Sequence, residues 1–178
     1  MSLLQPKICF IGLKGKGWPL AALIAKAGYP IVVSDNDRSL IDSFCSQTGA
    51  SALEPVGDLS SIETVMVALC DSKDTAAMLV GTYGLARLLR PGTCVINVQR
   101  SGGCHALSAA LAQYSLDYLG AELTGDLAQA GADPLDVVVT GVETAMQRRS
   151  ALFEVIGSAR YVGPLVSDGR IEVRDAAH

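Results

Sequence analysis

The chain has 178 residues, of which 49% are hydrophobic and 18% charged, and its net charge is −4. This length fits a globular unit with a sizeable core. The acidic balance and the absence of a basic cluster disfavour a nucleic-acid platform, and no apolar run approaches the roughly 20 residues of a membrane span. The five cysteines are scattered without C-x-x-C spacing, and the first residues carry no apolar signal segment. We therefore expect a cytoplasmic protein without a disulfide framework or a metal site.

Short apolar runs alternate with helix-like segments along the chain. The predicted strands are residues 7–12, 31–35, 50–52, 64–69, 93–97, 116–119, 135–140 and 160–162. The predicted helices are residues 18–27, 39–47, 74–80, 106–112, 127–130 and 143–156. Such alternation is typical of βαβ units joined by right-handed crossovers. It predicts an α/β fold over residues 1–164, with a doubly wound, mainly parallel Rossmann-type sheet and helices on both faces.

The first predicted strand leads into a glycine-rich turn, Gly12-Leu13-Lys14-Gly15-Lys16-Gly17. Strand, turn and helix N-terminus together form an anion cradle, because free backbone N–H groups and the helix dipole converge there. The spacing fits G-x-G-x-x-G except at Lys14, where the backbone normally passes close to a pyrophosphate. The ammonium groups of Lys14 and Lys16 could pair with phosphate, or Lys14 could fill the site. Two further alternatives remain. Gly12, Gly15 and Gly17 could form a shifted G-x-x-G-x-G loop, or the turn could serve only to join the strand to the helix.

An acidic residue, Asp35, ends the second predicted strand, where a carboxylate would bond the ribose hydroxyls of an adenosine. Asn36 follows it, whereas an arginine near this position would accommodate the 2′-phosphate of NADP. Arg38 lies two positions further on. If a dinucleotide binds, NAD(H) is therefore favoured over NADP(H). A solvated turn is the alternative interpretation of Asp35 and Asn36.

Together these segments resemble the cofactor-binding domain of the β-hydroxyacid dehydrogenases, the group of 3-hydroxyisobutyrate and 6-phosphogluconate dehydrogenases. The similar stretches are Ile11-Gly12-Leu13, Lys26-Ala27-Gly28-Tyr29, Gly49-Ala50, Gly81-Thr82-Tyr83-Gly84-Leu85, Pro91-Gly92, Leu123-Thr124-Gly125 and Val138-Val139-Thr140-Gly141. The resemblance implies an NAD(P) site formed by Gly12, Leu13, Lys14, Gly15, Lys16, Gly17, Asp35, Asn36, Leu69 and Cys70. It also implies that Thr124 occupies the position of the family's substrate-contacting serine.

The chain departs from this family at several positions. Besides Lys14, this chain has Leu69-Cys70 where the family usually has Leu-Pro. The family's Asp-x-Ser-Thr motif corresponds here to Asn97-Val98-Gln99-Arg100. Its Asp-Ala-Pro-Val-Ser-Gly-Gly motif corresponds to Gly120-Ala121-Glu122-Leu123-Thr124-Gly125-Asp126. The family's catalytic lysine lies on a long helix after this domain, and no lysine follows Lys73 here. We therefore expect that the helical C-terminal domain is absent and that this chain alone lacks dehydrogenase activity.

Two further features of the sequence give weaker indications of function. Cys104 and His105 follow one predicted strand and Cys70 ends another, so a Cys–His nucleophile at the same sheet edge is conceivable. Cysteines more often serve as small buried residues, however. In the tail, residues 165–178, the run Ile171-Glu172-Val173-Arg174 alternates like an edge strand, and a frayed terminus is the alternative.

Two function classes fit these patterns. In the first, the chain is an NAD(P)-binding homologue of an oxidoreductase family. In the second, it is a pseudoenzyme that serves as a protein-interaction or oligomerisation module and no longer binds a dinucleotide. Either class allows a homo-oligomer or a partner protein that supplies missing elements, and neither predicts a nucleic-acid or membrane partner.

Overall fold

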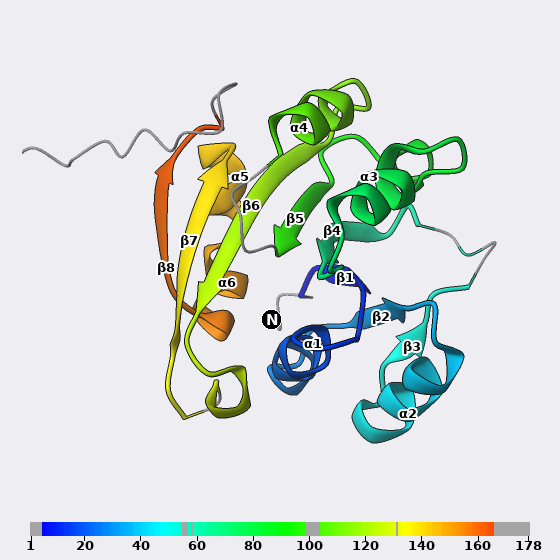
Figure 1. Ribbon diagram of the computed structural model, residues 1–178, viewed down its shortest axis with the longest axis vertical. Helices are drawn as coiled ribbons and strands as arrows, with labels where there is room; N and C mark the ends of the chain where they lie inside the picture. Colours follow the sequence, from blue (N-terminus) through cyan, green and yellow to red (C-terminus); the bar gives the residue numbers. More distant parts are fainter. Residues whose placement is uncertain (1–4, 55–56, 58, 99–103, 131, 166–178) are drawn as a thin grey trace, which may run out of the picture.

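The fold is built on one eight-stranded sheet with the order β3-β2-β1-β4-β5-β6-β7-β8 (Figure 1). The computed structural model describes residues 5–54, 57, 59–98, 104–130 and 132–165. The strands are β1 (Lys7–Ile11), β2 (Ile31–Ser34), β3 (Ser51–Ala52), β4 (Ile62–Val67), β5 (Cys94–Val98), β6 (Asp117–Thr124), β7 (Leu135–Gly141) and β8 (Gly157–Gly163). Neighbouring strands pair in parallel, except that β7 runs antiparallel to β6. The predicted doubly wound, mainly parallel sheet is confirmed.

Helices cover both faces of this sheet. They are α1 (Gly17–Lys26), α2 (Arg38–Thr48), α3 (Ser72–Val80), α4 (His105–Ala112), α5 (Glu143–Arg148) and α6 (Ser150–Ile156), with 3-10 turns η1 (Leu85–Arg87) and η2 (Leu127–Gln129). Residues of α1, α2, α5 and α6 share one core cluster with the sheet. Residues of α3, α4 and η1 belong to a second cluster, and Figure 1 shows α3 and α4 together, apart from α1 and α2. The sheet is thus enclosed from both sides, as its continuous apolar strands require.

The core is filled by strand residues that pack against helix side chains. Phe10 on β1 is fully buried, and so are Leu20 and Ile24 on α1. The ring of Trp18 on α1 meets Phe44 of α2 edge to face, with ring centroids 5.1 Å apart. This contact fixes the two helices that follow β1 and β2, and therefore the loops that precede those helices.

Several sequence-based boundaries need correction. The predicted helix 143–156 is two helices, because Arg149 leaves helical geometry with φ −117° and ψ 16°. The guanidinium of Arg149 donates to the Thr64 hydroxyl and the Glu63 carbonyl of β4, contacts that local sequence does not reveal. Strand β6 continues five residues beyond the predicted 116–119, to Thr124, because β7 pairs with it along that extension.

Two further segments differ in extent from the sequence-based prediction. The weak helix predicted at 127–130 is the 3-10 turn η2, and the last predicted strand, 160–162, spans Gly157–Gly163. The predicted edge strand at 171–174 lies outside the described residues, as do Gln99 and Arg100. Among the residues described, no helix has the length and apolar character needed to cross a membrane.

Candidate functional site

A cavity of about 580 Å³ opens at the carboxyl ends of β1, β2 and β4. Strand β1 lies between β2 and β4 in the sheet, so the chain connections leave it in opposite directions. Ligands of doubly wound sheets bind at such a switch point, because the diverging loops leave a crevice there. The predicted residues Gly12, Lys14, Asp35, Asn36, Leu69 and Cys70 all line this cavity.

The loop after β1 owes its shape to two different demands on glycine. Gly12 has φ +93° and Gly15 has φ +58°, values that L side chains rarely adopt. At Gly17 the constraint is space, because an added Cβ would lie 1.9 Å from the Gly12 carbonyl oxygen. Ser115 is the non-glycine residue with positive φ among those described, so Lys14 has a backbone conformation that suits a side chain. Lys14 therefore does not strain the loop.

Three backbone N–H groups at the tip of this loop point to anion binding. The Trp18 N–H donates to the Leu13 carbonyl at 2.9 Å, and the Gly17 N–H donates to the Lys14 carbonyl at 3.1 Å. Within the described part of the chain, no acceptor bonds the N–H groups of Lys14, Gly15 and Lys16. These donors stand where α1 begins, and the helix dipole adds to their positive potential. The loop therefore has the donors of an anion cradle.

Asp35 connects the loops after β1 and β2. One carboxylate oxygen accepts the Leu13 N–H at 2.7 Å, and the other accepts the Asp37 N–H at 2.9 Å. Each oxygen keeps a further lone pair for a ligand hydroxyl. The Leu13 side chain is 1% exposed and belongs to the core, so Leu13 contributes to the site only by positioning its neighbours.

The charges around the cavity are mainly negative. Asp35 and Asp74 line it together with one cation, Lys14. The pKa of nearby Asp37 is lowered, chiefly by the hydrogen bond from the Ser39 hydroxyl, and the positive charge of Lys14 adds to this effect. Lys14 thus lies in the electrostatic range of the turn after β2.

The opposite wall of the cavity was not predicted. It consists of Asp74, Ala77 and Met78 on α3 and of Gly81, Thr82 and Tyr83 just after that helix. The sequence resemblance includes the stretch 81–85, but it assigns no role to these residues. The crossover of α3 back over the sheet brings them into the same cavity as Asp35 and Lys14.

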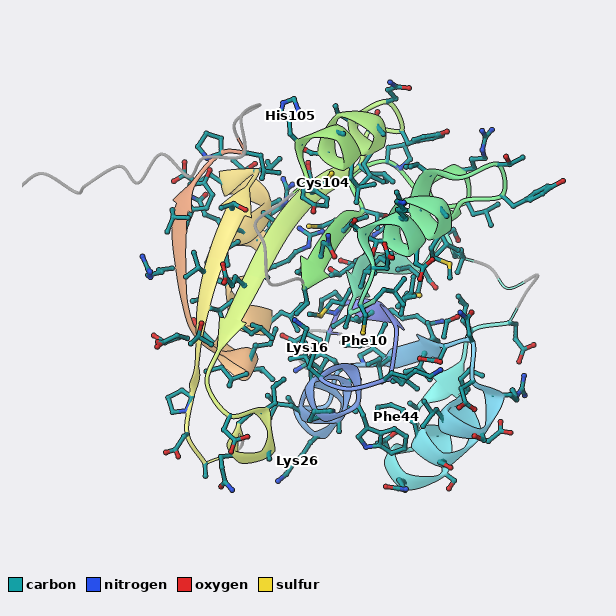
Figure 2. The ribbon with its side chains drawn as sticks, viewed as in Figure 1. Phe10, Lys16, Lys26, Phe44, Cys104 and His105 are labelled. Atoms are coloured by element: carbon teal, nitrogen blue, oxygen red, sulfur yellow. The ribbon has the colours of Figure 1, made fainter. Side chains whose placement is uncertain are left out.

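Other predicted site residues lie elsewhere. Thr124 is exposed at the end of β6, opposite Asp136 of β7, and does not line the cavity. Cys104 and His105 are exposed at the start of α4, and Figure 2 shows His105 directed outward, far from Lys16 beside α1. No group of three metal-ligating side chains gathers among the residues that the structure describes.

A buried polar pair lies beneath the start of α4. The Asn97 amide donates to the Tyr118 hydroxyl at 3.0 Å, and that hydroxyl also accepts the Cys104 N–H at 3.2 Å. Burial is the main cause that raises the pKa of Tyr118. Asn97 lies within β5, at the position that the sequence resemblance gives to the family's aspartate, and its amide group joins β5 to Tyr118 of β6.

Comparison with known proteins agrees with this arrangement. Residues 7–163 match the family model described as the NAD binding domain of 6-phosphogluconate dehydrogenase. An NAD-dependent L-serine dehydrogenase of Pseudomonas aeruginosa is 31% identical over 154 residues, which are 85% of this chain and 51% of that protein. An L-threonate dehydrogenase of Cupriavidus necator is 25% identical over 85% of this chain and 52% of its own length. The chain thus spans about half the length of these curated relatives.

Solved structures share the fold at lower identity. A 3-hydroxyisobutyrate dehydrogenase of Mycobacterium tuberculosis, solved with L-serine, superposes with a TM-score of 0.78 at 19% identity, over 94% of this chain and 57% of that one. An imine reductase of Myxococcus stipitatus, in complex with NADP⁺, gives 0.76 at 21% identity, over 89% of this chain and 55% of that one. By the match over residues 7–163, this chain belongs to the family of the NAD binding domain of 6-phosphogluconate dehydrogenase.

Proposed function

We propose that this chain binds NAD(H) in the cavity at the switch point. The observation that carries the proposal is that Asp35 accepts the Leu13 N–H, and that the next three N–H groups of the loop, those of Lys14, Gly15 and Lys16, have no acceptor among the described residues. A pyrophosphate needs such donors, and an adenosine ribose needs such an acceptor. The cavity has about 580 Å³, within the usual range for small-molecule sites. Family membership and the dinucleotide complexes of similarly folded proteins agree with this proposal.

The charge pattern favours NAD(H) over NADP(H). A 2′-phosphate would enter a region that Asp35 and Asp74 line, with Asp37 close by. Arg38, the cation nearest in sequence, already pairs with Asp42 at 3.1 Å. Like charges within a few ångströms disfavour the doubly charged phosphate. We expect NADPH to bind roughly tenfold or more weakly than NADH, a difference of about 1.4 kcal/mol.

Lys14 assists binding in this proposal. Its exposed side chain lines the cavity, and its backbone is unstrained, so its ammonium can approach a phosphate without moving the loop. An exposed ionic contact is worth about 0.5–1 kcal/mol, so Lys14→Ala should weaken NADH binding roughly two- to fivefold. Lys26→Ala is the matched control, because Lys26 is an exposed lysine in the last turn of α1, at the end of the helix far from the Lys14 loop.

The test is a titration of the purified chain with NADH and NADPH, followed by calorimetry and by energy transfer from Trp18. Saturable NADH binding that Lys14→Ala weakens and Lys26→Ala leaves unchanged would support the proposal. Tighter binding by Lys14→Gly would mean that the lysine obstructs the site. No saturation at millimolar NADH would refute the proposal and leave the interaction-module hypothesis as the better account.

We further propose that this chain binds the dinucleotide without catalysing hydride transfer by itself. No lysine follows Lys73, so the family's general acid/base has no counterpart among these residues. Thr124, at the position of the family's serine, lies outside the cavity. NAD⁺ reduction with L-serine or L-threonate should therefore stay at background. Turnover that is abolished by Thr124→Val would contradict this part of the proposal.

A further inference from the structure

Another cavity, of about 340 Å³, lies at the edge of the sheet where β4 and β5 begin. It is lined by three arginines, Arg90, Arg148 and Arg149, and we call it the arginine cavity. Glu63 supplies the one carboxylate among the described residues that line it. The whole chain has a net charge of −4, so this excess of positive charge is local. The cavity proposed for NAD(H) lies at the other end of β4, beside Leu69, so the two are separate.

A tight turn places Arg90 at the arginine cavity, because the Thr93 N–H donates to the Arg90 carbonyl at 3.2 Å. The central residues of the turn are Pro91 and Gly92, and Gly92 has φ +85°. Proline followed by a residue of positive φ is typical of a type II turn. The Thr93 hydroxyl donates to the Ile62 carbonyl at 3.2 Å, which ties the turn to β4. The backbone of Arg90 is therefore held in place before any ligand binds.

Protein groups satisfy the guanidinium of Arg90 poorly. The carboxylate of Glu63 stands 3.8 Å from it, too far for a hydrogen bond, and about half of each side chain is exposed. An exposed pair of this geometry contributes little to stability. No other described residue bonds this guanidinium. Its N–H donors are therefore available to a ligand in the cavity.

Arg148 and Arg149 reach the same cavity because the helix is interrupted between α5 and α6. Consecutive side chains of a continuous helix point about 100° apart, but Arg149 leaves helical geometry and its guanidinium reaches β4. That guanidinium bonds the Thr64 hydroxyl and two backbone carbonyls, and no carboxylate pairs with it within the described part of the chain. Arg148 pairs with Asp117 at 2.6 Å. A guanidinium has five N–H donors, so both arginines keep donors for a ligand.

We propose that the arginine cavity binds a phosphate group, either free or as a small phosphate monoester. Guanidinium groups bond phosphate oxygens in pairs, and such charge-assisted bonds are stronger than neutral ones. A phosphate monoester carries a charge of about −1.5 to −2 at pH 7, which complements the excess of positive charge. The volume of about 340 Å³ is at the small end of the range for ligand sites. This inference does not depend on the proposed NAD(H) binding, because the two cavities share no residue.

The test is a titration of the purified chain with inorganic phosphate, and with glycerol 3-phosphate as a monoester, by calorimetry at constant ionic strength. Wild type should saturate at millimolar phosphate, and acetate, with its single charge, should bind roughly tenfold or more weakly. Arg90→Gln should weaken phosphate binding roughly tenfold, because it removes one charged donor pair. Arg87→Gln is the matched control, since Arg87 is an exposed arginine of η1 that does not line the cavity.

A variant of Glu63 should act in the opposite direction. Glu63→Gln removes the carboxylate that competes for Arg90 and repels an anion, so phosphate should bind roughly two- to fivefold more tightly. If Arg90 and Glu63 served only as a surface ion pair, neither substitution would change phosphate binding. Both side chains are half exposed, so both variants should unfold at the wild-type temperature, which a thermal melt checks.

Three results would refute the inference. The first is that wild type shows no saturation at millimolar phosphate, and the second is that Arg90→Gln binds phosphate like wild type. The third is that Lys14→Ala loses phosphate binding while Arg90→Gln retains it, which would place the phosphate at the loop after β1. NADH binding should be equal in wild type and Arg90→Gln, so failure of either proposal is recognised separately. Tighter binding of glycerol 3-phosphate than of phosphate would support a monoester as the ligand, and the reverse order would support free phosphate.

Discussion

Gly17 should be the least replaceable residue of the loop after β1. An added Cβ would lie 1.9 Å from the Gly12 carbonyl oxygen and 2.8 Å from its carbon, whereas ordinary contacts begin at 3.4 Å. Both groups belong to the backbone, so no side chain can rotate away. Gly17→Ala must therefore push the start of α1 away from the end of β1.

The expected cost combines two effects. Overpacking against rigid neighbours costs about 1–3 kcal/mol. The shift also weakens the bonds from the Gly17 N–H to Lys14 and from the Trp18 N–H to Leu13, each worth about 0.5–1.5 kcal/mol. Alanine's better helix propensity returns up to about 1 kcal/mol. We expect a net loss of roughly 3 kcal/mol in the free energy of unfolding.

Gly15 provides the matched control in the same loop. No atom lies within 4 Å of the position that a Cβ would take there, but the φ of +58° strains an L side chain. Gly15→Ala should therefore cost only about 1 kcal/mol, and Gly15→Asn less, because asparagine tolerates this conformation. Urea unfolding followed by circular dichroism and Trp18 fluorescence measures all three variants. A Gly17→Ala variant as stable as wild type, or no more destabilised than Gly15→Ala, would refute the steric reasoning.

Two further predictions concern buried groups. Burial raises the pKa of Cys9 to about 12 from an ordinary value of 9.0, so the folded state keeps a proton that the unfolded state loses. The free energy of unfolding should therefore fall as the pH rises from 9 toward 12. Urea unfolding at several pH values should show a smaller fall for Cys9→Ala than for wild type, and an unchanged fall for the control Cys70→Ala, at an exposed site. An equal fall in both variants would contradict the prediction. Tyr118→Phe removes the hydroxyl that accepts the Asn97 amide and should cost about 1–3 kcal/mol, whereas Tyr114→Phe should cost little. Identical urea midpoints for these two tyrosine variants would argue against the buried pair.

The sequence predicted those parts of the fold that depend on local pattern. The apolar run at residues 64–69 indicated a buried strand, whose first four residues belong to β4, and Gly12 and Gly17 placed the strand-to-helix loop correctly. The residue at the end of β2, Asp35, could be assigned to the same sheet edge because parallel strands all end there. Six of the cofactor residues named from sequence do line one cavity.

Other features depended on partners distant in the chain. The extension of β6 to Thr124 exists because antiparallel β7 pairs with it, and the helix break at Arg149 coincides with its bonds to β4. Neither partner is recognisable from a local window.

For the loop with which the site begins, sequence identified the glycines, and the tertiary structure decided what each one does. Gly15 allows a positive φ, whereas Gly17 allows α1 to approach β1, and Lys14 fits without strain. The opposite wall, including Tyr83, depended wholly on the crossover of α3. A periodic pattern fixes which face of a helix is buried, but only packing of the whole chain decides which residues face one another across a cavity.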